Sequence, residues 1–363
     1  KPWGQECWIT GIEQRGQSSV ASPFSTVKTP LPWLLNLLPN YFSLTPHENP
    51  ILLKVLDPLP DEIYGDLYFE MHHQKQEVYV ITNIDTQAWP SGIAKMRFGF
   101  NQQKLATYSS QDHFKAAFSQ AVSAYFSTRK HIDELLDALK IKHNIALNDA
   151  ISVAQSKAWL STLPKHLTDL EQKLRKSIES FIGYIDLKQG DVIVIPKLTP
   201  HSLMHGVRCI EFQTPVYERQ ILFFAQKVLT QQHWDTDAAL MDIDISHPQD
   251  NGVIIQQQND KGSAISSTDK AVNIEKIVDF DGFTVFRYQL TSGAEAPITL
   301  QTPYCLLINV FGELSTLGLT LNTENACYIS REQLPDERCF SIYNNKKGDC
   351  AFLVALPKIQ VHE

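Results

Sequence analysis

Hydrophobic and polar residues follow two different patterns along this chain. From Gly4 to about Lys104, and again from Asp186 onward, short apolar runs rich in β-branched and aromatic residues alternate with turn residues, as in strands. Between about Gln111 and Phe181, apolar residues recur three and four positions apart, as on the buried face of an amphipathic helix. The pattern predicts a mainly β protein with an α insertion of three or four helices.

Individual elements can be placed within these regions. The expected strands have clear apolar runs, at 51–56, 77–82, 192–195, 284–288, 306–310 and 351–355. A helically spaced aromatic stripe indicates helix packing rather than a cofactor site, and it consists of Phe114, Phe118 and Tyr125. Asn148 and Asp149 fit an N-cap, and Gly183 fits the end of the last helix. The polar stretch 231–270 fits an exposed connection.

Composition narrows the class of protein. Hydrophobic residues make up 43% of the 363 residues and charged residues 20%, which is ordinary for a folded protein with a sizeable core. The formal net charge of −8 argues against a basic nucleic-acid-binding surface, and no apolar run is long enough to span a bilayer. We expect no signal peptide, since the first residues lead into polar and aromatic ones rather than an apolar run. The six cysteines include no Cys-x-x-Cys pair, which favours reduced core thiols. We therefore expect a cytoplasmic protein with no nucleic-acid or membrane partner.

The first candidate for chemistry lies at the end of an expected strand. Glu70 and His72 are two residues apart, so on a strand their side chains share one face. A short hairpin turn through 73–75 would bring Glu77 back beside them. His73 would point to the opposite face, which argues against it as a metal ligand.

A second strand–turn–strand segment carries a further histidine. Gly190 begins it, Pro196 ends its apolar run, and His201 follows after four intervening residues. Side by side in a small barrel, the two segments would deliver three or four oxygen and nitrogen ligands into one mouth. Such a set suits Zn, Fe, Mn, Ni or Co. The simpler alternative is an exposed polar turn plus a hydrogen-bonded histidine, and His205 fits a core or rim histidine.

These two segments resemble the two cupin motifs, with Glu70 in place of the usual first histidine. Their flanks make the chain similar to the class I mannose-6-phosphate isomerases, which also have a helical insertion before the second motif. The matching positions are Pro2-Trp3-Gly4, Glu70-Met71-His72, Lys75-Gln76-Glu77, Thr199-Pro200-His201, Glu211-Phe212-Gln213 and Arg219.

The resemblance implies a double-stranded β-helix fold and one divalent metal ion, zinc in this family. Matched residue by residue, the metal ligands would be Glu70, His72, Glu77 and His201. The implied parts are a catalytic cupin domain at 1–110 and 184–235, a helical insertion at 111–183, a connection at 236–263 and a degenerate, metal-free cupin-like domain at 264–363.

The implied activity is the interconversion of mannose 6-phosphate and fructose 6-phosphate, or of a related sugar phosphate. Moving a proton between C1 and C2 requires an electrophile, a base, and cations that hold the phosphate. The metal would be the electrophile, and Glu211 would be the base or relay. Lys75 and Arg219 would hold the phosphate, Arg219 through its planar fork. For Glu211, an ion pair with Arg208 or Arg219 is the simpler alternative.

Three departures from the family pattern concern the pocket. Glu70 stands where the family has glutamine, which adds a negative charge to the site. Only four residues separate His72 from Glu77, where relatives have a longer loop, and an apolar run follows Arg219 where relatives have an aspartate. Two other functions therefore remain open: another metal cupin enzyme, or a non-catalytic relative that binds a sugar phosphate.

Overall fold

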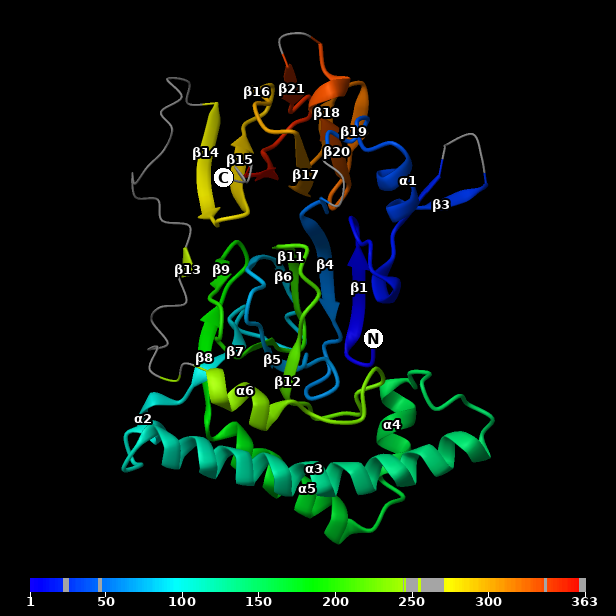
Figure 1. Cartoon of the computed structure of the whole chain (residues 1–363), viewed down its shortest axis with the longest axis vertical. Coiled ribbons are helices and arrows are strands. Elements are labelled where there is room, and N and C mark those ends of the chain that lie inside the picture. The colour runs from blue at the N-terminus through cyan, green and yellow to red at the C-terminus, as the bar shows by residue number, and fades with distance from the viewer. Residues whose placement is uncertain are drawn as a thin grey trace.

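The molecule is built in layers, with most of the helices on one side and the sheets stacked on them. The computed structural model describes residues 1–21, 26–44, 48–243, 245, 254–255, 271–335 and 338–358. Figure 1 shows the helical layer at the bottom, the N-terminal strands in the middle and the C-terminal strands at the top. The predicted class, mainly β with an α insertion, is confirmed.

The N-terminal strands form two sheets that face each other. One sheet is six-stranded, in the order β1 (Gly4–Trp8), β4 (Leu52–Pro58), β11 (Val207–Gln213), β6 (Glu77–Ile84), β9 (Val192–Ile195) and β13 (Ile254–Ile255). The other is five-stranded, in the order β12 (Gln220–Phe223), β5 (Phe69–Met71), β10 (His201–Leu203), β7 (Ala94–Phe100) and β8 (Ile182–Leu187). One apolar core draws on both, including Tyr79 and Ile81 from β6 and Met96 and Phe98 from β7.

The C-terminal strands form a second pair of sheets. Its five-stranded sheet has the order β14 (Val272–Asp279), β15 (Phe283–Leu290), β22 (Cys350–Pro357), β17 (Tyr304–Phe311) and β20 (Ala326–Ser330). Its four-stranded sheet has the order β16 (Glu295–Thr299), β21 (Cys339–Tyr343), β18 (Leu314–Thr316) and β19 (Leu319–Leu321). The apolar core between them includes Leu307, Phe352 and Ile342. A small hairpin of β2 (Ser19–Ala21) and β3 (Lys28–Pro30) projects beside α1 (Leu31–Leu37), as Figure 1 shows.

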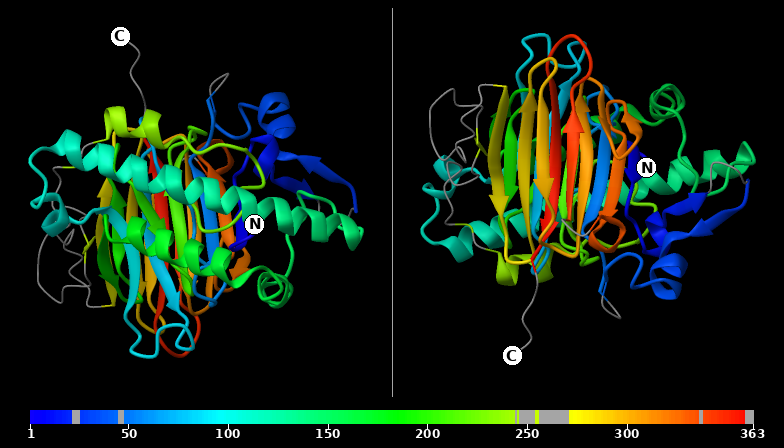
Figure 2. Two further views of the ribbon diagram at one scale, coloured as in Figure 1. Left: turned by 90° about the horizontal axis from the view of Figure 1, so that it is seen from below. Right: turned by 90° about the horizontal axis from the view of Figure 1, so that it is seen from above.

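The helical layer covers the outer face of the sheet that contains β5 and β12. It consists of α2 (Gln102–Leu105), α3 (Gln111–Lys142), α4 (Val153–Leu160), α5 (Lys165–Glu179) and α6 (Thr236–Asp242). Figure 2 shows α3 lying across the strands in the view from below. Phe114 and Phe118 pack edge-on against Phe100, and Tyr125 against Phe223, so the predicted helix packing is confirmed. Among the described residues, no helix has the length and apolarity needed to cross a membrane.

A shared apolar layer joins the two pairs of sheets. Alternate residues of β6, Val78 and Val80, point away from Tyr79 and pack with Leu306, Ile308 and other residues of the C-terminal sheet. We call this layer the seam. It buries one face of the six-stranded sheet and leaves the other face free to carry polar side chains.

Several local predictions are wrong. The N-cap of α4 is Ser152, whose hydroxyl accepts from the Gln155 backbone N–H, and not Asn148 or Asp149. The last helix ends at Glu179, and Gly183 lies inside β8, because the chain turns directly from the helix into that strand.

The predicted hairpin through 73–75 is also wrong, because β5 and β6 belong to different sheets and the segment crosses between them. The predicted connection begins with a helix, α6, and its remainder at 246–253 and 256–263 lies outside the described residues. The predicted limits of the individual domains stay a prediction. All six cysteines are free thiols, although Cys7 is exposed rather than part of a core.

Candidate metal centre and pocket

The two predicted motif segments meet at one end of the N-terminal pair of sheets. Glu70 on β5 is the register partner of His201 on β10, so adjacent strands carry these two side chains. His72 follows β5 directly. The backbone N–H of Leu198, which adopts a left-handed φ of 61°, donates to the His72 carbonyl at 2.8 Å and ties the two segments together.

Three of the four predicted ligands converge on one point. Ligand atoms of Glu70, His72 and His201 all lie within 4.8 Å of one another. His72 and His201 are buried, and their rings meet edge-on at a centroid distance of 5.2 Å. A group of one carboxylate and two imidazoles is a usual donor set for a divalent transition metal.

Glu77, the fourth predicted ligand, enters from the facing sheet at the start of β6. Its Oε2 lies 3.1 Å from His201 Nε2 and 3.4 Å from His72 Nε2. Four ligands bound tetrahedrally at the usual zinc distances lie about 3.3–3.6 Å apart. The carboxylate also accepts from Tyr79 Oη at 3.1 Å, and its Oε1 lies 2.5 Å from Lys75 Nζ.

Three of the polar atoms at this point lack a hydrogen-bond partner. Both ring nitrogens of His72 and Oε2 of Glu70 are buried without a hydrogen bond from any described residue. Leaving buried polar atoms unpaired costs about 1–3 kcal/mol each, so such a cluster of them is rare without a function. The residues present therefore fit a metal ion, although their roles as ligands stay a prediction.

Burial and nearby cations determine the protonation states of Glu77 and His72. Burial by itself would raise the pKa of Glu77, but the Lys75 ammonium and the two imidazoles outweigh it and hold that pKa well below its usual value. Burial and the nearby Lys75 charge lower the pKa of His72. The two groups are thus held as carboxylate and neutral imidazole, the forms that bind a metal ion.

Beside the cluster lies a pocket that Glu70 and Glu77 help to line. Glu211, on β11, lines the same pocket. It is buried and pairs with Lys54 Nζ at 3.0 Å, and not with Arg208 or Arg219. Burial raises the pKa of Glu211 to about 8, with the Glu77 charge adding to the rise and Lys54 opposing it. Arg208 lies elsewhere and bonds Glu324 and Asp57.

The two predicted phosphate-binding cations line this pocket at different places. Arg219 lies before β12, with Nε 3.8 Å from Glu70 Oε2, Nη2 donating to Thr230 Oγ1 at 2.9 Å, and its guanidinium carbon 4.8 Å from the centre of the Tyr68 ring. Lys75 is buried and held by Glu77.

The two remaining histidines near the motifs do not join the cluster. His73 points toward Asp242, with 3.9 Å between Nε2 and Oδ2. His205 is buried, stacks on Trp89 and places Nδ1 2.8 Å from Asp66 Oδ1. The prediction that His205 is a core or rim histidine is confirmed.

Sequence reasoning overlooked Lys54 and Tyr79, which line the same pocket. Lys54 is a lone cation inside the apolar run 51–56, and strand alternation turns it inward between Leu53 and Val55, which face the seam. That isolated charge was an available signal. Tyr79 is two residues after Glu77 and therefore shares its face.

Among the comparisons with known proteins, the one with solved structures identifies the fold. No protein-family profile matches the chain, and no curated protein matches it. Among solved structures, the mannose 6-phosphate isomerase from Bacillus subtilis is similar at a TM-score of 0.59 and 16% identity, over 98% of this chain and 96% of that one. A variant of phosphomannose isomerase from Salmonella typhimurium is similar at a TM-score of 0.54 and 14% identity, over 99% of this chain and 97% of that one. The chain therefore has the fold of the mannose-6-phosphate isomerases, over nearly its whole length.

Proposed function

We propose that this chain is a metal-dependent aldose–ketose isomerase of the class I mannose-6-phosphate isomerase family. It would interconvert mannose 6-phosphate and fructose 6-phosphate or a related sugar phosphate. In this proposal each pair of sheets is a double-stranded β-helix of the cupin type, and only the first carries a metal. The observation that carries the proposal is the convergence of Glu70, His72 and His201 at the mouth of the first pair.

The proposed ligands are Glu70, His72, Glu77 and His201, and the proposed ion is zinc. The unpartnered buried atoms of Glu70 and His72 support two members of this set. The approach of Glu77 Oε2 to His72 and His201 supports the other two. When bound, the ion supplies a Lewis acid that polarises the carbonyl oxygen of the sugar. The carboxylate of Glu70 lowers the net charge of the centre relative to an amide in the same place.

Glu211 is the proposed base for the proton that moves between C1 and C2. A carboxylate with a raised pKa holds a proton more strongly than an ordinary one, which suits a group that must take a proton from carbon and return it. Lys54 holds the carboxylate in place from the neighbouring strand, because the two residues are register partners.

Arg219 is the proposed phosphate ligand. Its planar guanidinium can donate two parallel hydrogen bonds to a phosphate. A bound phosphate would compete with Glu70 for this side chain, which lies 3.8 Å from Glu70 Oε2. Lys75, held against Glu77, would donate to an oxygen of the sugar nearer the metal ligands, or to the phosphate if it leaves Glu77.

The test is conversion of mannose 6-phosphate to fructose 6-phosphate by the purified full chain. We expect activity that is lost on chelation and restored by zinc, and that falls at least a thousandfold in His201→Ala. His166→Ala is the matched control, because His166 is exposed on α5. Activity that survives both chelation and His201→Ala would overturn the metal mechanism.

A second candidate is a relative that binds sugar phosphates without converting them. The observation that favours it is the approach of Arg219 to Glu70, which occupies the proposed phosphate ligand. Calorimetric binding of mannose 6-phosphate without turnover, in zinc-loaded protein, would select this candidate. Turnover of a different sugar or small acid, or a reaction that consumes oxygen, would instead identify another metal cupin enzyme.

A further inference from the structure

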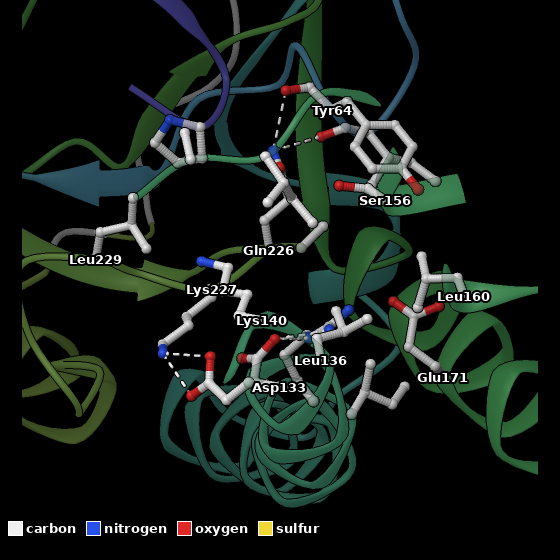
Figure 3. Close-up of a pocket in the computed structure, with 18 of the residues that line it drawn as sticks. Tyr64, Asp133, Leu136, Lys140, Ser156, Leu160, Glu171, Gln226, Lys227 and Leu229 are labelled. Atoms are coloured by element: carbon white, nitrogen blue, oxygen red, sulfur yellow. Dashed lines mark hydrogen bonds and ion pairs between the residues drawn. The ribbon is translucent and has the colours of Figure 1, made fainter. Parts of the chain in front are cut away.

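A second cavity lies between the helical layer and the N-terminal sheets. We call it the helix cavity, and its volume is ≈ 210 Å³. Figure 3 shows its walls, with Leu136 and Lys140 from α3, Leu160 from α4, Glu171 from α5, and Gln226 and Leu229 from the segment after β12. Among the described residues, none lines both this cavity and the pocket of the metal centre.

Much of the wall is hydrocarbon. Ile132, Leu136, Leu160, Ile151 and Leu229 all line the cavity, each from a different turn or segment. This part of the cavity offers water few hydrogen-bond partners, because its side chains are aliphatic. The cavity is a good place for a small apolar molecule, and its volume lies below the roughly 300 Å³ at which pockets for drug-sized ligands begin.

The described cations of the wall already have partners. Arg129 Nη2 lies 2.6 Å from Asp133 Oδ1, and Lys227 Nζ lies 2.6 Å from Asp137 Oδ2. The third cation of the lining, Lys140, donates to two backbone carbonyls, those of Leu147 and Asp149, at 3.0 and 2.6 Å. An anionic ligand would have to displace these partners, so the wall favours an uncharged one.

One amide group of the wall is fixed in orientation. Gln226 Nε2 donates to the carbonyls of Ile63 and Tyr64 at 3.3 and 2.9 Å, as Figure 3 shows. Both hydrogens of that amide are thereby used. The carbonyl oxygen Oε1 has no hydrogen-bond partner among the described residues, so it remains an acceptor for a ligand that can donate one hydrogen bond.

We propose that the helix cavity binds an uncharged small molecule with an apolar body and one hydroxyl group. The apolar body contacts Leu136 and Leu160, and the hydroxyl donates to Gln226 Oε1. The site is separate from the metal centre, and its chemistry is opposite to that of a sugar-phosphate pocket.

The test uses two fluorinated probes that differ by one hydroxyl, 4-fluorophenol and fluorobenzene, with binding to the full chain followed by fluorine NMR. We expect saturable binding of both. Leu136→Trp and Leu160→Trp, which fill the cavity from different helices, should each weaken both probes at least tenfold. The matched control is Leu170→Trp, because Leu170 is exposed on α5, and it should bind as the wild type does.

A polar variant tests the hydrogen bond. Gln226→Leu should weaken 4-fluorophenol by about threefold to tenfold, the value of one hydrogen bond, and leave fluorobenzene within about twofold. Circular dichroism checks that each variant is folded. The proposal is overturned if neither probe saturates, or if a folded filling variant binds both probes with wild-type affinity. Equal loss of both probes in Gln226→Leu would overturn the assignment of the hydroxyl.

Discussion

Lys54 Nζ lies 3.0 Å from Glu211 Oε1 on adjacent strands, and both side chains are buried. The same ammonium lies 2.5 Å from Gln213 Oε1 and 3.9 Å from Glu6 Oε1. Burial opposes the charge on Lys54, but Glu211 and Glu6 outweigh it and raise the pKa of Lys54 above its usual value. The floor of the pocket is therefore a buried ion pair whose members depend on each other.

Replacing Lys54 with methionine should lower the free energy of unfolding by about 3–5 kcal/mol, because Glu211, whose pKa is already raised to about 8, would lose its cation and have to take up a proton or stay as an unpaired buried charge. Urea unfolding measures this. Lys95→Met, at an exposed position on β7, should change stability by no more than about 0.5 kcal/mol. Equal losses in the two variants would show that the Lys54–Glu211 pair contributes nothing specific.

The amount of bound metal should fall when a predicted ligand is replaced and stay unchanged when a neighbouring non-ligand is replaced. We expect one equivalent of a divalent metal in the wild-type chain by mass spectrometry of the digested protein, and less than a tenth of that in His72→Ala. His73→Ala should keep the wild-type content, because His73 points toward Asp242. These neighbouring histidines make a close control, and a full equivalent of metal in His72→Ala would contradict the ligand set.

Glu70→Gln should have opposite effects on the binding of the metal ion and on the binding of an anionic sugar phosphate. Removing the carboxylate should weaken metal binding about tenfold, since the centre loses a negative charge. It should also tighten binding of an anionic sugar phosphate about tenfold, because Arg219 is released from its contact 3.8 Å away. Calorimetry with zinc and with mannose 6-phosphate measures both. A change of the same sign for both ligands would refute the charge argument.

Stability at acid pH should depend on Asp66. Burial alone would raise its pKa, but Arg97 and His205 outweigh burial and lower it below the model-peptide value of about 3.9. The folded chain thus holds this carboxylate ionised more strongly than the unfolded chain does. The stabilisation is present above about pH 4 and is lost as the pH falls further toward the lower folded pKa.

The corresponding measurement compares the wild type with Asp66→Asn. At pH 7 the variant should lose about 3 kcal/mol of unfolding free energy, because the buried Arg97 loses its close partner at 2.7 Å and keeps only Glu179, 3.6 Å away. The difference should shrink as the pH is lowered below 4. A difference that stays constant between pH 7 and pH 3 would show that the lowered pKa of Asp66 does not contribute.

The sequence predicted side-chain positions well where they follow from the period of a single strand or helix. Alternation along a strand predicts that Glu70 and His72 lie on one side, and the helical stripe of Phe114, Phe118 and Tyr125 predicts its packing on a sheet. Both follow from a local period in the chain. The spacing of the two segments added Glu77 and His201 to the candidate cluster, and the resemblance matched all four to one ligand set. The structure places Glu77 Oε2 3.1 Å from His201 Nε2.

What could not be predicted depends on contacts between segments far apart in the chain. No local pattern tells that β5 and β6 lie in different sheets, so the turn between His72 and Glu77 was expected as a hairpin. The partner of Glu211 is Lys54, which lies 157 residues away in the chain. The helix cavity has the same origin, since its walls come from the helical insertion and from the segment after β12.

Through the seam, the C-terminal pair of sheets supports a pocket that none of its described residues lines. On β6, Val78 and Val80 face the seam while Glu77 and Tyr79 face the candidate metal centre. The packing of Val78 and Val80 in the seam thus fixes the positions of the polar residues beside them on this strand. A fragment ending before β14 would expose that apolar face to water and should aggregate. The N-terminal pair of sheets, which carries the pocket, therefore depends on the C-terminal pair for its solubility.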